Sequence, residues 1–167
     1  MTFVSNHDKN TWDGTQFDLF GDALGATIVL SVVGEGVPLI YSGQEAGNTK
    51  RLEFFEKDLI EWRAHPIGEL YRKLFALLES NTALWHGRWG ASMVPVANDL
   101  PDQVYSFVRS NDRDRVFAVF NFSAEPQNVR FAAPLPQGQY TDYFSGVTAA
   151  LPAGLELEPW GYRVFVR

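Results

Sequence analysis

The stretch Phe3-Val4-Ser5-Asn6-His7-Asp8 decides how the first half of the chain is interpreted. A short β-type run stands directly ahead of an adjacent histidine and aspartate. In parallel α/β barrels the active site lies at the C-terminal ends of the strands, where polar side chains are presented in this way. The stretch therefore predicts a barrel strand that carries His7 and Asp8 at its functional end. The alternative is a polar turn in which Asp8 caps a neighbouring backbone group.

Helical and strand patterns alternate after this stretch. Thr15-Gln16-Phe17-Asp18 predicts a capping box at the start of a helix, and Gly34 is placed to end it. Val37–Tyr41 is a short apolar run typical of a buried parallel strand. Pro66 favours the start of a second helix. The order strand, helix, strand, helix predicts a βαβα unit. The apolar stripe expected on the second helix comprises Ile67, Tyr71, Leu74 and Leu78.

After about Leu84 the helical period gives way to short strands separated by turn residues, a pattern typical of an antiparallel sandwich. Ser110–Asp114 predicts a polar hairpin loop. We therefore expect a mixed α+β chain with two domains: a βαβα unit over residues 1–84, which the resemblance described below implies to be a C-terminal barrel segment, and an antiparallel β-sandwich over residues 85–167. The predicted strands are Val104–Arg109, Val116–Phe122, Val129–Phe131, Gln139–Tyr143, Leu155–Leu157 and Arg163–Val166.

Length and composition exclude several classes of protein. The chain has 167 residues, whereas a complete (β/α)8 barrel needs roughly 250, or at least about 200. The net charge of −6, without a Lys/Arg cluster, argues against a nucleic-acid partner. The absence of cysteine excludes disulfides and thiolate metal sites. The longest apolar stretch, Ala26–Val33, is too short to span a membrane, and no signal peptide is visible, which leaves the localisation open.

A second motif, Gly36-Val37-Pro38-Leu39-Ile40-Tyr41-Ser42-Gly43-Gln44-Glu45-Ala46-Gly47, stands one helix after the first. It is similar to the eighth barrel strand and following loop of the α-amylase family of glycoside hydrolases, a Gly-x-Pro-x-Ile-Tyr-x-Gly-Gln-Glu pattern. Phe3–Asp8 resembles the Phe-x-x-Asn-His-Asp signature that follows the seventh strand in that family. Glu69–Leu84 resembles the eighth helix. The two motifs come in the order that the barrel requires. On this resemblance, the chain begins near the end of a catalytic barrel and continues into the β-sandwich domain.

The resemblance implies roles for individual residues. Asp8 matches the carboxylate that stabilises the transition state, and His7 matches the histidine that contacts the same sugar. Asn6, Lys9 and Trp12 are expected to bind substrate, Trp12 by stacking on a sugar; packing of Trp12 against the neighbouring helix start is the open alternative. The implied substrate is an α-glucan or maltooligosaccharide, such as starch or maltodextrin. The family's calcium ligands lie upstream, so we expect no cofactor or metal in this chain, although the intact enzyme could use calcium.

The departures from the family pattern limit the expected activity. A retaining glycosidase needs a nucleophile and a general acid about 5–5.5 Å apart. In the family these residues follow the fourth and fifth strands, which this chain lacks. Glu35 and Glu45 read as surface or loop groups instead. We therefore expect the chain to be inactive alone, and the unpaired strand edges of an incomplete barrel to cause self-association or domain swapping.

Two other interpretations stay open. The sandwich could be a noncatalytic carbohydrate-binding module, which requires at least two exposed, coplanar aromatic rings. It could also serve a purely structural role. The loop charges read as a solvated face, and the tryptophans other than Trp12 as packing residues. These loop residues are Arg51, Glu53, Glu56, Lys57 and Asp58, and the tryptophans are Trp62, Trp85, Trp89 and Trp160.

Overall fold

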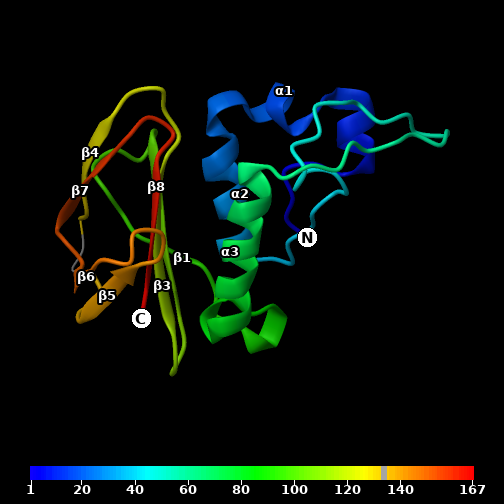
Figure 1. Ribbon diagram of the computed structural model, residues 1–167. Coiled ribbons are helices and arrows are strands. Elements are labelled where there is room, and N and C mark those ends of the chain that lie inside the picture. Colours follow the sequence, from blue (N-terminus) through cyan, green and yellow to red (C-terminus); the bar gives the residue numbers. More distant parts are fainter. Residues whose placement is uncertain (133–134) are drawn as a thin grey trace. The chain divides into compact units, whose positions relative to one another are not determined.

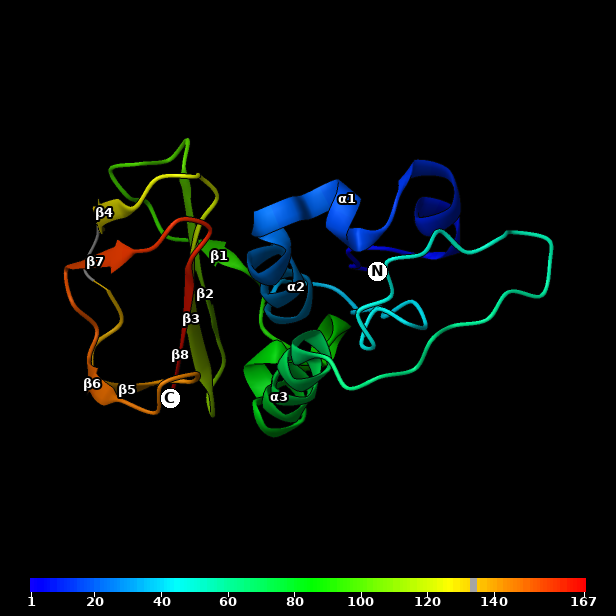
Figure 2. The same cartoon turned by 45° about the horizontal axis from the view of Figure 1, so that its top comes forward.

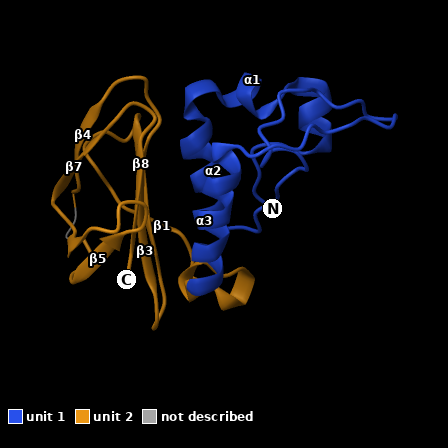
Figure 3. Cartoon of the chain, viewed as in Figure 1, with its two compact units in different colours: residues 1–80 blue, residues 81–167 orange. Residues whose placement is uncertain are grey.

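The chain divides into two units at the end of a helix (Figures 1 and 3). A computed structural model describes residues 1–132 and 135–167, with unit 1 over Met1–Ser80 and unit 2 over Asn81–Arg167. The sequence placed a domain boundary four residues later, after Leu84, and that division stays a prediction. Thr82 shows why the segment between the two positions groups with unit 2. Its backbone N–H and hydroxyl both donate to the Asp114 carboxylate in the loop of a β-hairpin.

Unit 1 opens its helical part where the sequence predicts it. Thr15 accepts a hydrogen bond from the Asp18 N–H, and Asp18 accepts one from the Thr15 N–H, which confirms the capping box. The predicted single helix is divided in the structure, because Gly21 adopts a φ of 48°. The elements are α1 (Gln16–Phe20), a 3-10 turn (Gly21–Ala23) and α2 (Leu24–Val33). Gly34 follows α2 and ends the helix as predicted.

The second helix, α3 (Pro66–Ser80), begins at the predicted proline. It lies beside α2 in unit 1 (Figure 1). On α3 the buried side chains are Tyr71, Leu74 and Leu77, and on α2 they include Ile28, Val29, Val32 and Val33. Tyr71 and Leu74 belong to the predicted stripe, while Leu77 replaces Leu78 as a fully buried position.

The run Gln16–Val33 is long and apolar enough, by length and composition alone, to cross a membrane. The sequence analysis considered only the shorter stretch from Ala26. A core helix of a soluble protein passes the same test, so one such helix is weak evidence for a membrane span. Ala26, Ile28 and Val29 are fully buried in the structure.

The two segments predicted as neighbouring parallel strands meet at one point. A parallel bridge joins Thr2 to Pro38, with hydrogen bonds from the Thr2 N–H to the Val37 carbonyl and from the Leu39 N–H to the Thr2 carbonyl, both 2.9 Å. The parallel direction agrees with the predicted βαβα order. The pairing is a single bridge within residues 1–132 and not a continuous ladder, and Val37 is exposed where the sequence predicted a buried strand. Gly36 permits the approach, since a Cβ there would lie 2.7 Å from Thr2 Cγ2.

Unit 2 is the predicted antiparallel sandwich (Figure 2). A six-stranded sheet has the order β1-β2-β3-β8-β5-β6, and β4 pairs with β7 in a second sheet. All pairs are antiparallel. Phe117, Val119 and Val129 are fully buried in the core between the sheets. The strands are β1 (Val94–Pro95), β2 (Val104–Ser110), β3 (Arg115–Asn121), β4 (Gln127–Arg130), β5 (Gln139–Asp142), β6 (Thr148–Ala150), β7 (Gly154–Leu157) and β8 (Tyr162–Val166).

Each of the six predicted strands is confirmed to within two residues at either end. The β2–β3 hairpin turns at the predicted polar loop, where the Asn111 N–H donates to the Asp114 carbonyl. Two strands, β1 and β6, were not predicted. Short 3-10 turns at Thr82–Leu84 and Gly87–Trp89 precede the first strand.

Candidate functional site

His7 and Asp8 lie side by side at the end of the segment that carries the parallel bridge. The His7 Nε2 atom is 3.4 Å from the Asp8 Oδ1 atom, and the two side chains are 64% and 57% exposed. Both groups are therefore open to solvent and to any ligand that approaches this edge of unit 1.

The polar-turn interpretation of Asp8 is wrong in one respect. A π-helical turn, Lys9–Asp13, follows Asp8, but the Asp8 side chain makes no capping hydrogen bond to it. Asn6 serves this purpose instead, because its Oδ1 atom accepts a 2.8 Å hydrogen bond from the Lys9 N–H. Asn6 thus fixes the turn that presents Asp8, and the Asp8 carboxylate is not committed to the backbone of that turn.

The side chain of Lys9, a predicted substrate-binding residue, pairs with another residue of the Lys9–Asp13 turn. Its ammonium group forms an ion pair with Asp13, four residues later. The hydrogen bond with Asp13, and then the charge of that carboxylate, raise the pKa of Lys9 above its ordinary value. Lys9 stays positively charged near His7 and Asp8 and adds a cation to the same surface.

Trp12 is largely exposed and contacts a ring from another segment of unit 1. Its side chain is 59% exposed, and its ring lies 5.5 Å from the ring of Phe54, centroid to centroid. Phe54 belongs to a long segment without helix or strand that links the second motif to α3 (cyan to green in Figure 2). The structure therefore brings an aromatic residue from this loop to the predicted site, which the sequence analysis did not foresee.

A continuous set of hydrogen bonds joins this loop to the turn after Asp8. The Thr11 hydroxyl donates to the Leu52 carbonyl at 2.6 Å, and the Leu52 N–H donates to Asn10 Oδ1 at 2.8 Å. The Arg51 guanidinium donates to the carbonyls of Thr11 and Trp12 at 2.6–3.0 Å. We call these contacts between residues 10–12 and 50–52 the seam. Arg51 was read as part of a solvated charged face, whereas it holds two segments together.

Asp58 closes the same loop. Its carboxylate pairs with Lys50 and accepts the N–H of Glu53 at 3.1 Å. The hydrogen bond from Lys50, followed by the one from Glu53, lowers the pKa of Asp58. Residues 50 and 58 are thus tied together, so the chain between them forms a closed excursion that carries Phe54 and Phe55.

The second motif contains a buried side-chain amide, that of Gln44. Its Oε1 atom accepts the Tyr41 N–H at 2.7 Å, and its Nε2 atom donates to Gln16 Oε1 at 3.1 Å and to the Tyr71 hydroxyl at 3.5 Å. Burial, and then the charge of Glu45, raise the pKa of the Tyr71 hydroxyl. Gln44 therefore ties the loop to α1 and α3.

Glu45 lies in the second motif and is half-buried in the structure. Glu45 accepts the Gly43 N–H through its Oε2 atom at 2.9 Å, which makes it a loop-stabilising group. Among residues 1–132 and 135–167, no group of three or more His, Asp or Glu side chains is placed to hold a metal ion.

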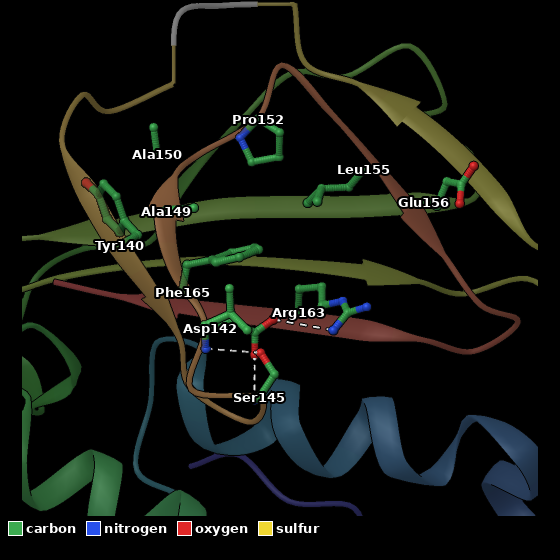
Figure 4. A pocket seen from close by; sticks show the side chains of 11 residues that line it. Tyr140, Asp142, Ser145, Ala149, Ala150, Pro152, Leu155, Glu156, Arg163 and Phe165 are labelled. Carbon is green, nitrogen blue, oxygen red and sulfur yellow. Dashed lines mark hydrogen bonds and ion pairs between the residues drawn. The ribbon is translucent and has the colours of Figure 1, made fainter.

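Unit 2 contains a cavity of about 500 Å³ lined by residues of β5 to β8 (Figure 4). Asp142 and Tyr140, two polar residues of its lining, are paired within the protein. Asp142 accepts the N–H groups of Phe144 and Ser145 at 3.0 Å and faces Arg163 at 3.4 Å. The Tyr140 hydroxyl accepts a hydrogen bond from Arg115.

The carbohydrate-binding interpretation needs an exposed pair of coplanar rings. In the part of unit 2 that the structure describes, the exposed aromatic side chains are Trp85 and Trp89, and no ring contact joins them. The Arg88 guanidinium covers Trp89, 4.5 Å from its ring centroid. Trp62, Trp85 and Trp89 are 62%, 41% and 66% exposed, and their packing role stays a prediction. No observation in unit 2 favours a separate sugar platform.

Comparison with known proteins gives consistent matches. Residues 96–154 match the family "Alpha amylase, C-terminal all-beta domain". The chain is 24% identical over 159 residues to Alpha-amylase 2 of Dictyoglomus thermophilum, covering 87% of this chain and 26% of that protein. It is 31% identical over 65 residues to Oligo-1,6-glucosidase IMA5 of Saccharomyces cerevisiae, covering 39% of this chain and 11% of the relative. The chain thus spans about a quarter or less of the curated relatives that it matches.

Solved structures give the same fold over nearly the whole chain. The noncanonic maltogenic alpha-amylase AmyB from Thermotoga neapolitana superposes with a TM-score of 0.80 at 18% identity, covering 98% of this chain and 40% of AmyB. An Anoxybacillus alpha-amylase superposes with a TM-score of 0.77 at 16% identity, covering 98% of this chain and 37% of that one. Together, these findings show that residues 96–154 resemble the C-terminal all-β domain of α-amylases and that the chain has the fold of the C-terminal portion of α-amylase structures.

Proposed function

We propose that this chain is part of a retaining glycoside hydrolase that acts on α-glucans, by hydrolysis of glucosidic bonds or by transfer between them. The printed names of its relatives, an alpha-amylase and an oligo-1,6-glucosidase, support this substrate class. The chain contributes one side of the substrate site, through the segment that ends in His7 and Asp8.

In this proposal Asp8 stabilises the transition state and His7 contacts the same sugar. The observation that carries it is the solvent-open Asp8 carboxylate, which makes no cap to its own turn and lies 3.4 Å from His7. Hydrogen bonds to sugar hydroxyls that strengthen as the ring distorts contribute several kcal/mol in glycoside hydrolysis. Asn6 positions the turn, while Lys9 and Trp12 border the sugar.

The chain assayed alone is proposed to be catalytically inactive. A retaining reaction needs a nucleophile and an acid about 5–5.5 Å apart, and the family places both on strands that this chain does not include. Asp8 alone can bind and orient a sugar but cannot form or break the glycosidic bond. Binding is therefore the property of this chain that tests the site.

The test is a calorimetric titration of the chain with maltoheptaose, with the β-linked cellohexaose as the control sugar. We expect maltoheptaose to bind and Asp8→Asn to weaken that binding, because a carboxylate accepts stronger hydrogen bonds from hydroxyls than an amide does. Asp22→Asn, a change of an exposed acid in the turn before α2, is the matched control for net charge.

Two results would contradict the proposal. Equal binding by the wild type and Asp8→Asn would remove Asp8 from the sugar site. Reducing-sugar release from soluble starch by the purified chain, abolished in Asp8→Asn, would show that a catalytic pair is completed in a way not described above.

A further inference from the structure

We infer that Trp12, Phe54 and Phe55 form an aromatic contact surface for the α-glucan chain, next to the sugar unit that Asp8 contacts; the rings are inclined by 39° and 74°, so each would contact a sugar separately instead of forming one flat platform. We call this set the aromatic shelf. The inference rests on the proposed function and extends it, because it assigns binding of further sugar units to a loop that neither motif contains.

The rings of the shelf follow one another away from the predicted site. Phe54 lies 5.7 Å from the His7 ring and 5.5 Å from the Trp12 ring, centroid to centroid. Phe55 continues the series, 4.7 Å from Phe54 in an edge-on arrangement. His7 therefore links the shelf directly to the residue pair that is proposed to bind the reacting sugar.

The three rings of the shelf are exposed in this chain. Trp12 is 59%, Phe54 37% and Phe55 83% exposed. Contiguous exposed apolar surface rimmed by polar residues marks binding sites in soluble proteins. Glu53 and Glu56, which flank the two phenylalanines in the sequence, are exposed.

A glucan chain fits this combination of groups. A pyranose ring has an apolar face of C–H groups and a rim of hydroxyls, so it can lie on an aromatic ring while its hydroxyls reach charged neighbours. Ligand sites in proteins share this design, with aromatic side chains that provide area and a few polar groups that fix orientation.

The seam holds the shelf in place before any ligand arrives. Arg51 and Leu52 are bonded to residues 10–12 immediately ahead of Phe54, and Lys50 pairs with Asp58 beyond Phe55. Both ends of the excursion are therefore fixed relative to the turn that carries Trp12. Because a preorganised surface loses little conformational freedom on binding, exposed rings on such a loop retain affinity.

The test compares maltose and maltoheptaose binding by calorimetry in single variants of the whole chain. We expect Phe54→Ala and Phe55→Ala each to weaken maltoheptaose binding about three- to tenfold, the range of one aromatic contact, with a smaller effect on maltose. Phe54→Tyr should bind maltoheptaose with an affinity close to that of the wild type, because tyrosine keeps the aromatic ring. Leu59→Ala is the matched control, since Leu59 is 75% exposed on the same loop but carries no ring.

The outcomes separate the shelf from the proposed function. If Phe54→Ala and Phe55→Ala bind maltoheptaose as Leu59→Ala does, while Asp8→Asn weakens it, the shelf is overturned and the proposed site stands. If the shelf variants weaken binding and Asp8→Asn does not, the rings bind sugar but the Asp8 assignment fails. A wild-type chain that binds neither sugar overturns both.

Discussion

Gln16 and Gln44 exchange two hydrogen bonds in unit 1. The Gln16 Nε2 atom donates to the Gln44 carbonyl, and the Gln44 Nε2 atom donates to Gln16 Oε1, both at 3.1 Å. Both residues are buried. The first residue of α1 is thereby fixed to the loop after the parallel bridge, and the glutamine of the second motif has a structural role in this chain.

Replacing Gln44 by alanine should destabilise unit 1. The Tyr41 N–H would lose its 2.7 Å acceptor, and Gln16 Oε1 would lose the donor on the Gln44 side chain, while the bond from Gln16 Nε2 to the backbone carbonyl at position 44 would remain. Buried groups left without partners cost about 1–3 kcal/mol. Urea unfolding should show a lower midpoint with an unchanged slope. Gln103→Ala, at an exposed position, is the control; equal midpoints for the two variants would refute the structural role.

Gly47→Ala should destabilise the chain more than Gly21→Ala. Both glycines have positive φ values, 65° and 48°, at which an L side chain is strained. Only at Gly47 does the added Cβ meet another group, the His65 ring at 2.4 Å, whereas nothing lies within 4 Å of a Cβ at Gly21. We expect the melting temperature of Gly47→Ala to be lower than that of Gly21→Ala, because only the first variant adds a steric clash to the backbone strain. Equal melting temperatures would show that His65 moves freely.

Asp18 should make stability depend on pH in the acid range. The Thr15 hydroxyl, followed by the Thr15 N–H, lowers the pKa of Asp18 below its ordinary value of 3.8. The stabilisation by the ionised carboxylate is therefore complete above pH 3.8 and is lost as the pH falls through the lower, folded-state pKa.

The melting-temperature difference between the wild type and Asp18→Asn should accordingly be largest near neutral pH and shrink at acid pH. Asp22→Asn, which changes the net charge equally, serves as the reference. A difference that does not change with pH would show that the carboxylate charge does not contribute through the capping box.

Unit 1 should self-associate at high protein concentration. Thr2 and Pro38 form a single parallel bridge, so the outer edges of these segments present backbone groups that another copy can pair with. Light scattering coupled to size exclusion should give a mass above that of one chain, rising with concentration. A single mass equal to that of the monomer across the whole concentration range would argue against pairing through these edges.

The sandwich could be predicted because its strands carry a strong local signal. β3, for example, contains Val, Phe and Ala at fully buried positions between turn-forming loops. The two missed strands lack that signal. β1 has two exposed residues and includes Pro95, and β6 is exposed throughout, with Ala149 and Ala150. Strands β1 and β6 form by pairing with β2 and β5. Such pairing leaves no periodic pattern in the sequence of the strand itself.

The site could be predicted in part. His7 and Asp8 were found because a motif places them, but the shelf depends on a contact between residues far apart in the sequence. Phe54 and Phe55 stand among charged residues, so the segment resembled a solvated surface. Two adjacent phenylalanines in a charged loop were the available signal, since exposed pairs of this kind are unusual without a ligand.

The closed excursion between Lys50 and Asp58 has a consequence for how new specificities arise. Since the ion pair and the seam fix both its ends, residues inserted or deleted between them leave the remainder of unit 1 unchanged. The cost of a longer closed loop grows only slowly with its length. We therefore expect evolution or protein engineering to change the sugar preference through this excursion with little loss of folding stability.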